Sequence, residues 1–213
     1  MHMLDIIQHM HDSDKVRPDH SGLFDVATEQ LGYFTAAQAR AAGFGRDMLS
    51  YHTQSGRFLR LRHGLYRFRD YPSSPLEEVM EAWLAVGKDV AVVSHESALE
   101  LLGLSDVVPN AVHLTVPRSK RYLGKTHGTR IHTTTNPLLS NDVTVRDGIH
   151  LTNATRTILD AAEAGSAPEQ IEMAVIQAIR RGFTTPGRLE REANERPERV
   201  KRLVTQSIEQ ATL

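Results

Sequence analysis

The stretch between residues 21 and 70 constrains the fold more than any other part of the sequence. It holds three short helical patterns that are separated by glycines. Apolar residues at helical spacing run from Leu23 to Leu31, the capping pair Thr35 and Gln38 opens a second helix, and a third spans about 46–54. Two short helices joined by a glycine-containing turn of about three or four residues form a helix-turn-helix.

A basic hairpin pattern follows these helices directly. The segment RFLRLR precedes His63-Gly64, and LYRFR follows it, so arginines are interleaved with apolar residues on both sides of a turn. Three helices followed by a hairpin are the plan of a winged helix-turn-helix. Such a domain places its third helix in the DNA major groove and its wing against the backbone or the minor groove.

The third helix and the hairpin supply the candidate DNA-binding residues. Met48, Leu49 and His52 are expected to face inward, which leaves polar side chains outward that can hydrogen-bond base edges, beside arginines that suit phosphates. The candidates are Arg46, Ser50, Tyr51, Gln54, Arg57, Arg60, Arg62, Arg67 and Arg69. Two alternatives stay open. In one, the arginines only keep the outer face of a half-buried hairpin solvated; in the other, the winged helix mediates protein contacts.

The positive charge of the chain is unevenly placed, although the net charge is only −1. Six arginines face one acid between residues 44 and 69, and the segment 107–141 contains no acid at all. This second basic island lies on and beside a loop between strands expected at 112–116 and 129–133, and it comprises Arg118, Lys120, Arg121, Lys125 and Arg130. It would contact a toxin or nucleic acid, or else protect a sheet edge from aggregation.

The sequence divides into two domains of an α+β protein. We expect a tail or short helix at 1–20, the winged helix-turn-helix at 21–70, a turn-rich linker at 71–75 and a C-terminal domain at 76–213. The C-terminal domain should hold a small sheet, which includes a hairpin around Asp147-Gly148. Its last third should be helical, at about 153–164, 168–181, 186–194 and 197–211.

Composition excludes several classes of protein. The chain has no cysteine, which rules out disulfides, thiolate catalysis and cysteine-bound zinc. No apolar run approaches the roughly 20 residues of a membrane span, and the first residues do not resemble a signal peptide, so we expect a cytoplasmic protein. His2, His9, His11 and His20 lack the spacing of a metal site on one helix, and neither a metal nor a cofactor is expected.

The signals for catalysis are weak. Ser94, His95 and Glu96 are consecutive, but adjacent residues on a helix point in different directions and make no catalytic triad. Ser94 is better explained as the N-cap of a helix. We therefore expect no enzymatic activity.

The order of motifs resembles the AbiEi-type antitoxins of abortive-infection toxin–antitoxin pairs, historically called type IV. The resemblance covers about residues 21–185 and rests on Ala42-Gly43, GRFLRLRHGLYR at 56–67, VSHESAL at 93–99, Gly103-Leu104, HLTVP at 113–117 and TRTILD at 155–160. Two positions depart from the pattern. Gly45 stands where a capping serine is common, and His52 stands where an inward leucine is expected.

The resemblance implies a function for each domain. The N-terminal domain would bind inverted repeats in its own promoter and repress the operon, while the C-terminal domain would neutralise a toxin of nucleotidyltransferase fold. Ser94, His95 and Arg156 would then be structural. The alternative is a stand-alone winged-helix transcriptional regulator whose second domain senses a ligand or dimerises.

Overall fold

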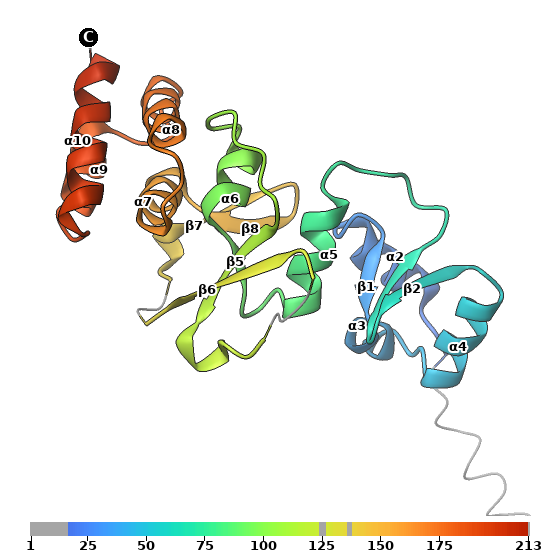
Figure 1. Ribbon diagram of the computed structural model, residues 1–213. Helices are drawn as coiled ribbons and strands as arrows, with labels where there is room; N and C mark the ends of the chain where they lie inside the picture. The colour runs from blue at the N-terminus through green and yellow to red at the C-terminus, as the bar shows by residue number, and fades with distance from the viewer. Residues whose placement is uncertain (1–16, 124–126, 136–137, 213) are drawn as a thin grey trace, which may run out of the picture. The chain divides into compact units, whose positions relative to one another are not determined.

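The computed structural model describes residues 17–123, 127–135 and 138–212 (Figure 1). The chain forms two compact units, Met1–Ser74 and Pro75–Leu213, and each has its own sheet. The class is α+β, as expected from the sequence: helices and a small sheet come first, and a larger sheet with a helical C-terminal part follows.

The first unit has the element order of a winged helix-turn-helix. Its helices and strands are α2 (His20–Thr28), β1 (Tyr33–Thr35), α3 (Ala36–Ala41), α4 (Arg46–Gln54), β2 (Phe58–Arg62) and β3 (Leu65–Phe68). Helix α2 begins at His20, the last residue of the segment expected to be a tail or short helix. The Asp19 side chain accepts a hydrogen bond from the Gly22 amide and caps the helix.

Local sequence accounts for the turns of this unit. Thr35 and Gln38 form the predicted capping box, in which each side chain accepts a hydrogen bond from the other residue's backbone amide. The three strands pair antiparallel in the order β1-β3-β2. Gly64 takes a positive φ of 74° at the tip of the wing, and its carbonyl accepts a hydrogen bond from the Ala36 amide.

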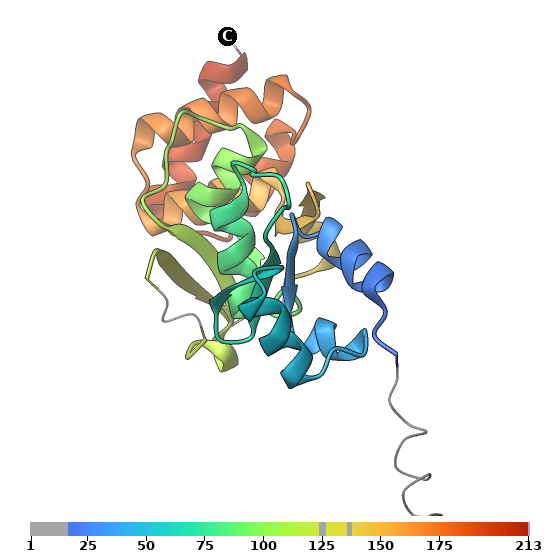
Figure 2. The same cartoon turned by 90° about the vertical axis from the view of Figure 1, so that its right-hand side faces the viewer.

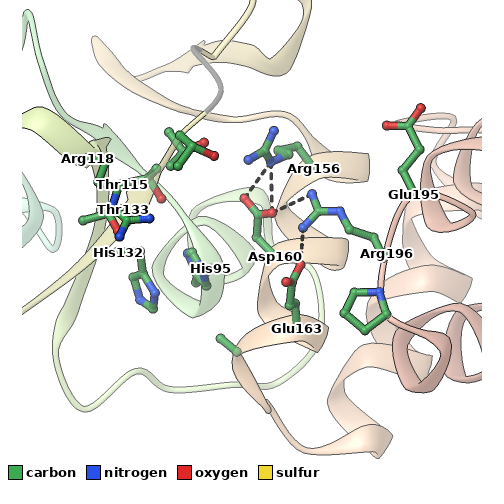
Figure 3. A pocket seen from close by; sticks show the side chains of 14 residues that line it. His95, Thr115, Arg118, His132, Thr133, Arg156, Asp160, Glu163, Glu195 and Arg196 are labelled. Carbon is green, nitrogen blue, oxygen red and sulfur yellow. Dashed lines mark hydrogen bonds and ion pairs between the residues drawn. The ribbon is translucent and has the colours of Figure 1, made fainter.

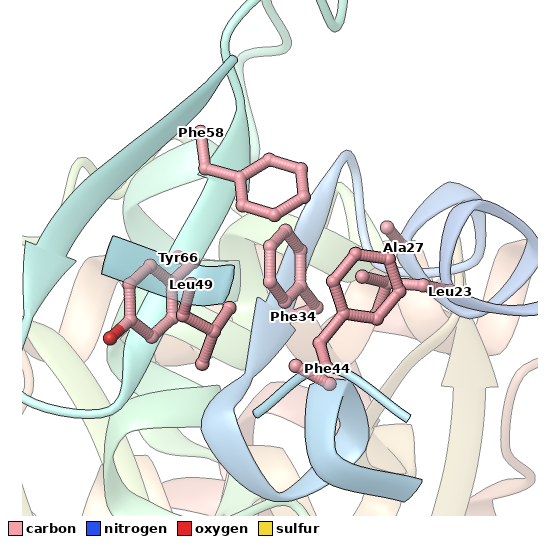
Figure 4. Packing of buried hydrophobic residues seen from close by; sticks show 8 residues of the cluster. Leu23, Ala27, Phe34, Phe44, Leu49, Phe58 and Tyr66 are labelled. Atoms are coloured by element: carbon pink, nitrogen blue, oxygen red, sulfur yellow. The ribbon is translucent and has the colours of Figure 1, made fainter. Parts of the chain in front are cut away.

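An aromatic cluster holds the first unit together. Phe34 lies between Phe44 and Phe58 in Figure 4, and its ring centroid is 4.9 Å from that of Phe58. Leu23 and Ala27 of α2 and Leu49 of α4 close the cluster, and all of these side chains are buried. Burial of large aromatic rings dominates core energetics, so this cluster fixes α4 against the wing.

The second unit is built on a five-stranded mixed sheet. Its elements are α5 (Glu77–Val86), β4 (Val92–Val93), α6 (His95–Leu102), β5 (Val112–Pro117), η1 (Arg118–Lys120), β6 (Thr129–Thr134), η2 (Ser140–Asp142), β7 (Val143–Arg146), β8 (Ile149–Thr152), α7 (Ala154–Ala164), α8 (Pro168–Arg180), α9 (Pro186–Ala193) and α10 (Glu198–Thr212) (Figures 1 and 2). The strand order is β6-β5-β4-β8-β7, in which β5 pairs parallel with β6 and β4 pairs parallel with β8.

The hairpin β7–β8 confirms the turn predicted from its sequence. Asp147 and Gly148 both have positive φ values, 50° and 77°, as a two-residue type I′ turn requires. The four C-terminal helices also lie where helical periodicity places them. Helix α10 packs against α8 and α9 and buries Val200 and Val204.

Side-chain alternation on β5 and β6 positions a polar group of residues in the second unit. Val112, Leu114 and Val116 alternate along β5 with His113 and Thr115. Thr115 is the register partner of His132 on β6, so the two side chains project from the same face. The second unit therefore has a polar sheet face in addition to its apolar core.

Candidate functional sites

Helix α4 presents one face to the core and the other to solvent. Leu49 and His52 are buried and Met48 packs against the aromatic cluster, as expected for the inward side. The exposed residues are Arg46, Asp47, Ser50, Tyr51 and Gln54. Tyr51 is 67% exposed, so its ring is available on the solvent face of the helix.

The two departures from the family pattern leave this helix intact. Gly45 takes the N-cap position with extended backbone and no side-chain cap, and the helix runs from Arg46 regardless. His52 packs 4.9 Å from the Phe58 ring and 5.7 Å from the His20 ring. Burial, with Arg57 and His20 nearby, lowers the pKa of His52. A neutral imidazole thus occupies the place of an apolar side chain.

A groove of about 690 Å³ runs between α4 and the wing. Phe44, Leu49 and Tyr66 contribute apolar surface to it, and polar and basic residues complete its lining: Arg40, Arg46, Ser50, Thr53, Gln54, Arg60 and His63. The sequence analysis missed Arg40 and His63. Arg40 lies in the last turn of α3, outside the basic run counted from residue 44, and only the fold places it on the same groove as Arg46.

The arginines of the wing differ in accessibility. Arg57, Arg60 and Arg69 are exposed, and Arg62 is half-buried. The Nε atom of Arg69 donates to the Gly56 carbonyl, which ties this side chain to the base of the wing. Exposed guanidinium groups are free to approach a phosphate backbone, so Arg57 and Arg60 are the clearest contacts on the wing.

The assignment of Arg67 to DNA contact requires correction. Arg67 is 7% exposed, and its guanidinium donates to the carbonyls of Leu31, Tyr71 and Pro72 at 2.8–3.3 Å. It also lies over the Tyr33 ring, 5.4 Å from the centroid. Since burial and these donor bonds occupy the side chain, Arg67 acts as a brace between the sheet and the segment at 71–72.

The structure separates the members of the second basic island. Arg118 lines a polar cavity, Lys120 lines a different hollow near β4 and β8, and Arg121 and Arg130 are exposed. Lys125 lies outside the described residues. The described members of the island therefore differ in their surroundings: Arg118 and Lys120 line two hollows, and Arg121 and Arg130 line neither.

The polar cavity has a volume of about 530 Å³ and lies within the second unit. Residues from β5, β6, η1, α7 and the connection between α9 and α10 line it, as Figure 3 shows. Buried hydrogen bonds join Thr115 Oγ1 to Ser94 Oγ and Ser94 Oγ to His95 Nδ1, each at 2.8 Å. The His95 and His132 rings stack at 3.5 Å between centroids.

A shared carboxylate organises the other side of this cavity. Both Asp160 oxygens accept from Arg156 Nε, at 2.9 and 2.8 Å, and Oδ1 also accepts from Arg196 Nη2 at 2.8 Å. Arg196 Nη1 pairs with Glu163. Asp160 and Glu163 raise the pKa of Arg196 against the opposing effect of burial. The network anchors the α9–α10 connection to α7.

Ser94 occupies the N-cap position of α6, as expected, but its hydroxyl makes no capping bond. The hydroxyl is fully buried and is hydrogen-bonded to Thr115 and His95 instead. Burial, followed by His132, lowers the pKa of His95 to about 2. An inaccessible hydroxyl beside such a weakly basic imidazole lacks the features of an activated nucleophile.

The described residues contain neither a metal-binding cluster nor a membrane-spanning helix. No group of three or more His, Cys, Asp or Glu side chains within 17–123, 127–135 and 138–212 is arranged to hold a metal ion. In the same ranges, no helix has the length and apolar character needed to cross a membrane. His2, His9 and His11 lie outside the described residues.

Comparison with known proteins links the first unit to a regulator family. Residues 23–69 match the family described as "Transcriptional regulator, AbiEi antitoxin". Among solved structures, the fold is similar to that of the RV2827C protein from Mycobacterium tuberculosis, with a TM-score of 0.60 and 15% identity over 93% of this chain and 79% of that chain. This likeness concerns the fold alone. Comparison with curated proteins yields no match.

The bracing role of Arg67 generates a stability prediction. Arg67→Ala should lower the free energy of unfolding of the first unit by about 2–4 kcal/mol, because it removes a buried side chain and leaves three carbonyls without the donor that they share. Urea unfolding followed by far-UV circular dichroism measures this loss. Arg60→Ala removes the same charge from an exposed position and should change the free energy by less than about 0.5 kcal/mol. Equal effects of the two substitutions would contradict the brace.

The buried imidazoles generate a pH prediction. Burial is the largest cause that lowers the pKa of His95 to about 2 and of His132 to about 4, both below the unfolded value of about 6.5. The unfolded chain therefore takes up these protons first, and the stability of the second unit should fall as the pH is lowered from 6.5 toward 4.

Fluorescence of Trp83, the single tryptophan, reports unfolding of this unit in urea. The unfolding midpoint should be lower at pH 5 than at pH 7, and His132→Gln should reduce the difference. A midpoint that is the same at both pH values would contradict the prediction.

Proposed function

We propose that this chain, whose residues 23–69 match the AbiEi antitoxin transcriptional regulators, binds the promoter of its own operon and neutralises a toxin of nucleotidyltransferase type. The main support for the DNA-binding part of this proposal is the solvent-exposed face of α4. Arg46, Ser50 and Gln54 are exposed there, beside a groove whose rim also carries Arg40 and Arg60.

The contacts divide into two kinds. Ser50 and Gln54 have donor and acceptor atoms for base edges, and Gln54 Nε2 already lies 3.2 Å from Ser50 Oγ, so the two side chains would read adjacent groups together. Arg57, Arg60 and Arg69 would contact phosphates, with Arg62 beside them. The resemblance implies inverted repeats in the promoter, and two copies of the chain would then occupy one operator.

For neutralisation, the proposal is that the second unit binds the toxin. Support comes from the separation of the chain at Ser74–Pro75, since each unit has its own sheet and its own buried core. The exposed residues Arg121 and Arg130 are proposed toxin contacts. A DNA-binding antitoxin of this kind acts in the cytoplasm and needs no catalytic residue.

The alternative is a stand-alone winged-helix regulator whose second domain senses a ligand. The polar cavity of the second unit favours this alternative, because small-molecule sites have volumes of this order. A toxin gene beside the gene for this chain would favour the antitoxin.

The DNA-binding proposal predicts a salt dependence. If about five phosphates are contacted, the logarithm of the affinity for promoter DNA should fall with the logarithm of the salt concentration at a slope near −4 to −5. Arg57→Ala with Arg60→Ala should weaken binding and reduce the slope by about 2. Fluorescence anisotropy with a labelled promoter fragment measures both quantities.

The matched control for that double variant is Arg191→Ala with Arg202→Ala. It removes two exposed arginines from α9 and α10 and should leave both affinity and slope unchanged. If the affinity of the unsubstituted chain for promoter DNA did not change with salt concentration, the DNA-binding proposal would be wrong.

The division of labour predicts separable activities in the cell. Co-expression of the full chain with the adjacent open reading frame should restore growth, and the chain should repress a reporter under its own promoter. The variant with Arg57→Ala and Arg60→Ala should restore growth but no longer repress. Loss of both activities together would contradict the division, and a harmless neighbour would leave only the DNA-binding role.

A further inference from the structure

The polar cavity of the second unit is not used by the proposed function, and its two ends differ in charge. Figure 3 places Arg118, Thr133 and His132 at one end and Glu195 with Arg196 at the other, with Arg156 and Asp160 between them. Arg118 and Arg156 are therefore the cations closest to the threonine and histidine end. An anionic group of a ligand would bind at that end.

The guanidinium groups at this end retain free donors. Arg156 uses its Nε atom on Asp160, and no described residue occupies its two Nη atoms. The side chain of Arg118 has no partner among the described residues. Asp160, by contrast, already accepts from two arginines and is 6% exposed. The carboxylate therefore fixes Arg156 in place while leaving the outer edge of its guanidinium for a ligand.

Hydroxyl groups extend this donor set. Thr133 and Thr135 are exposed at the end of β6, line the cavity and have no partner among the described residues. Two guanidinium groups from separate elements, together with hydroxyls, match the several oxygen atoms of a phosphate. A single carboxylate would need only one bidentate arginine.

The histidine pair supplies an uncharged aromatic surface. His95 and His132 stack with an interplanar angle of 16°, and both line the cavity. Burial lowers the pKa of each, and Arg130 lowers both further, so the two rings are neutral at physiological pH. Neutral imidazoles offer flat faces and ring nitrogens to a nucleobase, and histidine is among the side chains on which bases stack.

The opposite end suits a sugar. The Glu195 carboxylate is exposed at that end and Glu163 lies beside Arg196, so acceptor oxygens are available for hydroxyl groups. The cavity volume of about 530 Å³ lies within the range of roughly 300–1,000 Å³ typical of small-molecule sites.

We propose that this cavity binds a nucleoside monophosphate, with the phosphate between Arg118 and Arg156, the base against the imidazole pair and ribose hydroxyls toward Glu195. The site is independent of the proposed DNA and toxin contacts. It gives the second unit a ligand-binding role whatever its partner protein.

Isothermal titration calorimetry on the purified full chain tests this proposal. The probes are AMP, GMP, CMP and UMP, each titrated separately, with ribose 5-phosphate and inorganic phosphate as partial ligands. At least one nucleotide should bind about tenfold more tightly than inorganic phosphate, and ribose 5-phosphate should fall between them. Equal affinities for a nucleotide and inorganic phosphate would overturn the nucleotide assignment.

Arg118→Ala is the decisive variant, because Arg118 has no partner whose loss would disturb the fold. It should weaken nucleotide binding by about tenfold or more without changing the melting temperature. Arg121→Ala removes a nearby exposed arginine that does not line the cavity, and its affinity should be unchanged. Equal losses in both variants would show a diffuse charge effect and overturn the site.

A second arm tests the base and separates the rival occupant. His132→Ala should weaken the nucleotide but leave ribose 5-phosphate unchanged; equal weakening of both would remove the stacking assignment. If no probe binds at millimolar concentration while Arg118→Ala abolishes growth rescue, the cavity takes an acidic segment of the toxin and the proposal fails. DNA and toxin are absent from the calorimetry, so its outcome is distinct from that of the proposed function.

Discussion

The alternation of side chains along β5 is the constraint on which the second unit depends. Leu114 and its apolar neighbours enter the core, so His113 and Thr115 must project from the other face. Thr115 Oγ1 is hydrogen-bonded to Ser94 Oγ, which is in turn hydrogen-bonded to His95 Nδ1. Because β5 and β6 pair in parallel register, the His132 ring stacks on the His95 ring. Strand β5 thus contributes side chains both to the core of the second unit and to the wall of its cavity.

In the first unit, the positions of α4 and the wing depend on two polar side chains that are buried. Arg67 sits in the middle of a basic hairpin, yet its donors are used by backbone carbonyls. His52 lies on the helix proposed to recognise DNA, yet its ring is part of the core. These buried polar groups orient α4 and the wing, and the exposed arginines beside them gain defined positions from that rigidity.

The two units treat arginine differently. On the wing, Arg57 and Arg60 are exposed, an arrangement suited to a long polyanion. In the cavity, Arg156 and Arg196 share Asp160, which compensates much of their charge and fixes their direction. An exposed array favours affinity with little geometric demand, whereas Arg156, held in place by Asp160, favours a ligand of defined shape. Under the two proposals, arginine therefore serves two distinct modes of anion recognition.

Local patterns in the sequence determined the class of fold, the capping box at Thr35, the Asp147-Gly148 turn and the C-terminal helices, because caps, tight turns and helical periodicity depend on residues close along the chain. The inward side of α4 followed from its period as well. Only the tertiary structure decided that Arg67 is a brace and that Arg40 borders the groove. It alone joined Arg118, His132 and Arg156 around one cavity. Those outcomes depend on which distant segments meet. The motifs that contain His95 and Arg156 are visible in the sequence, but nothing local shows that these two residues border one cavity.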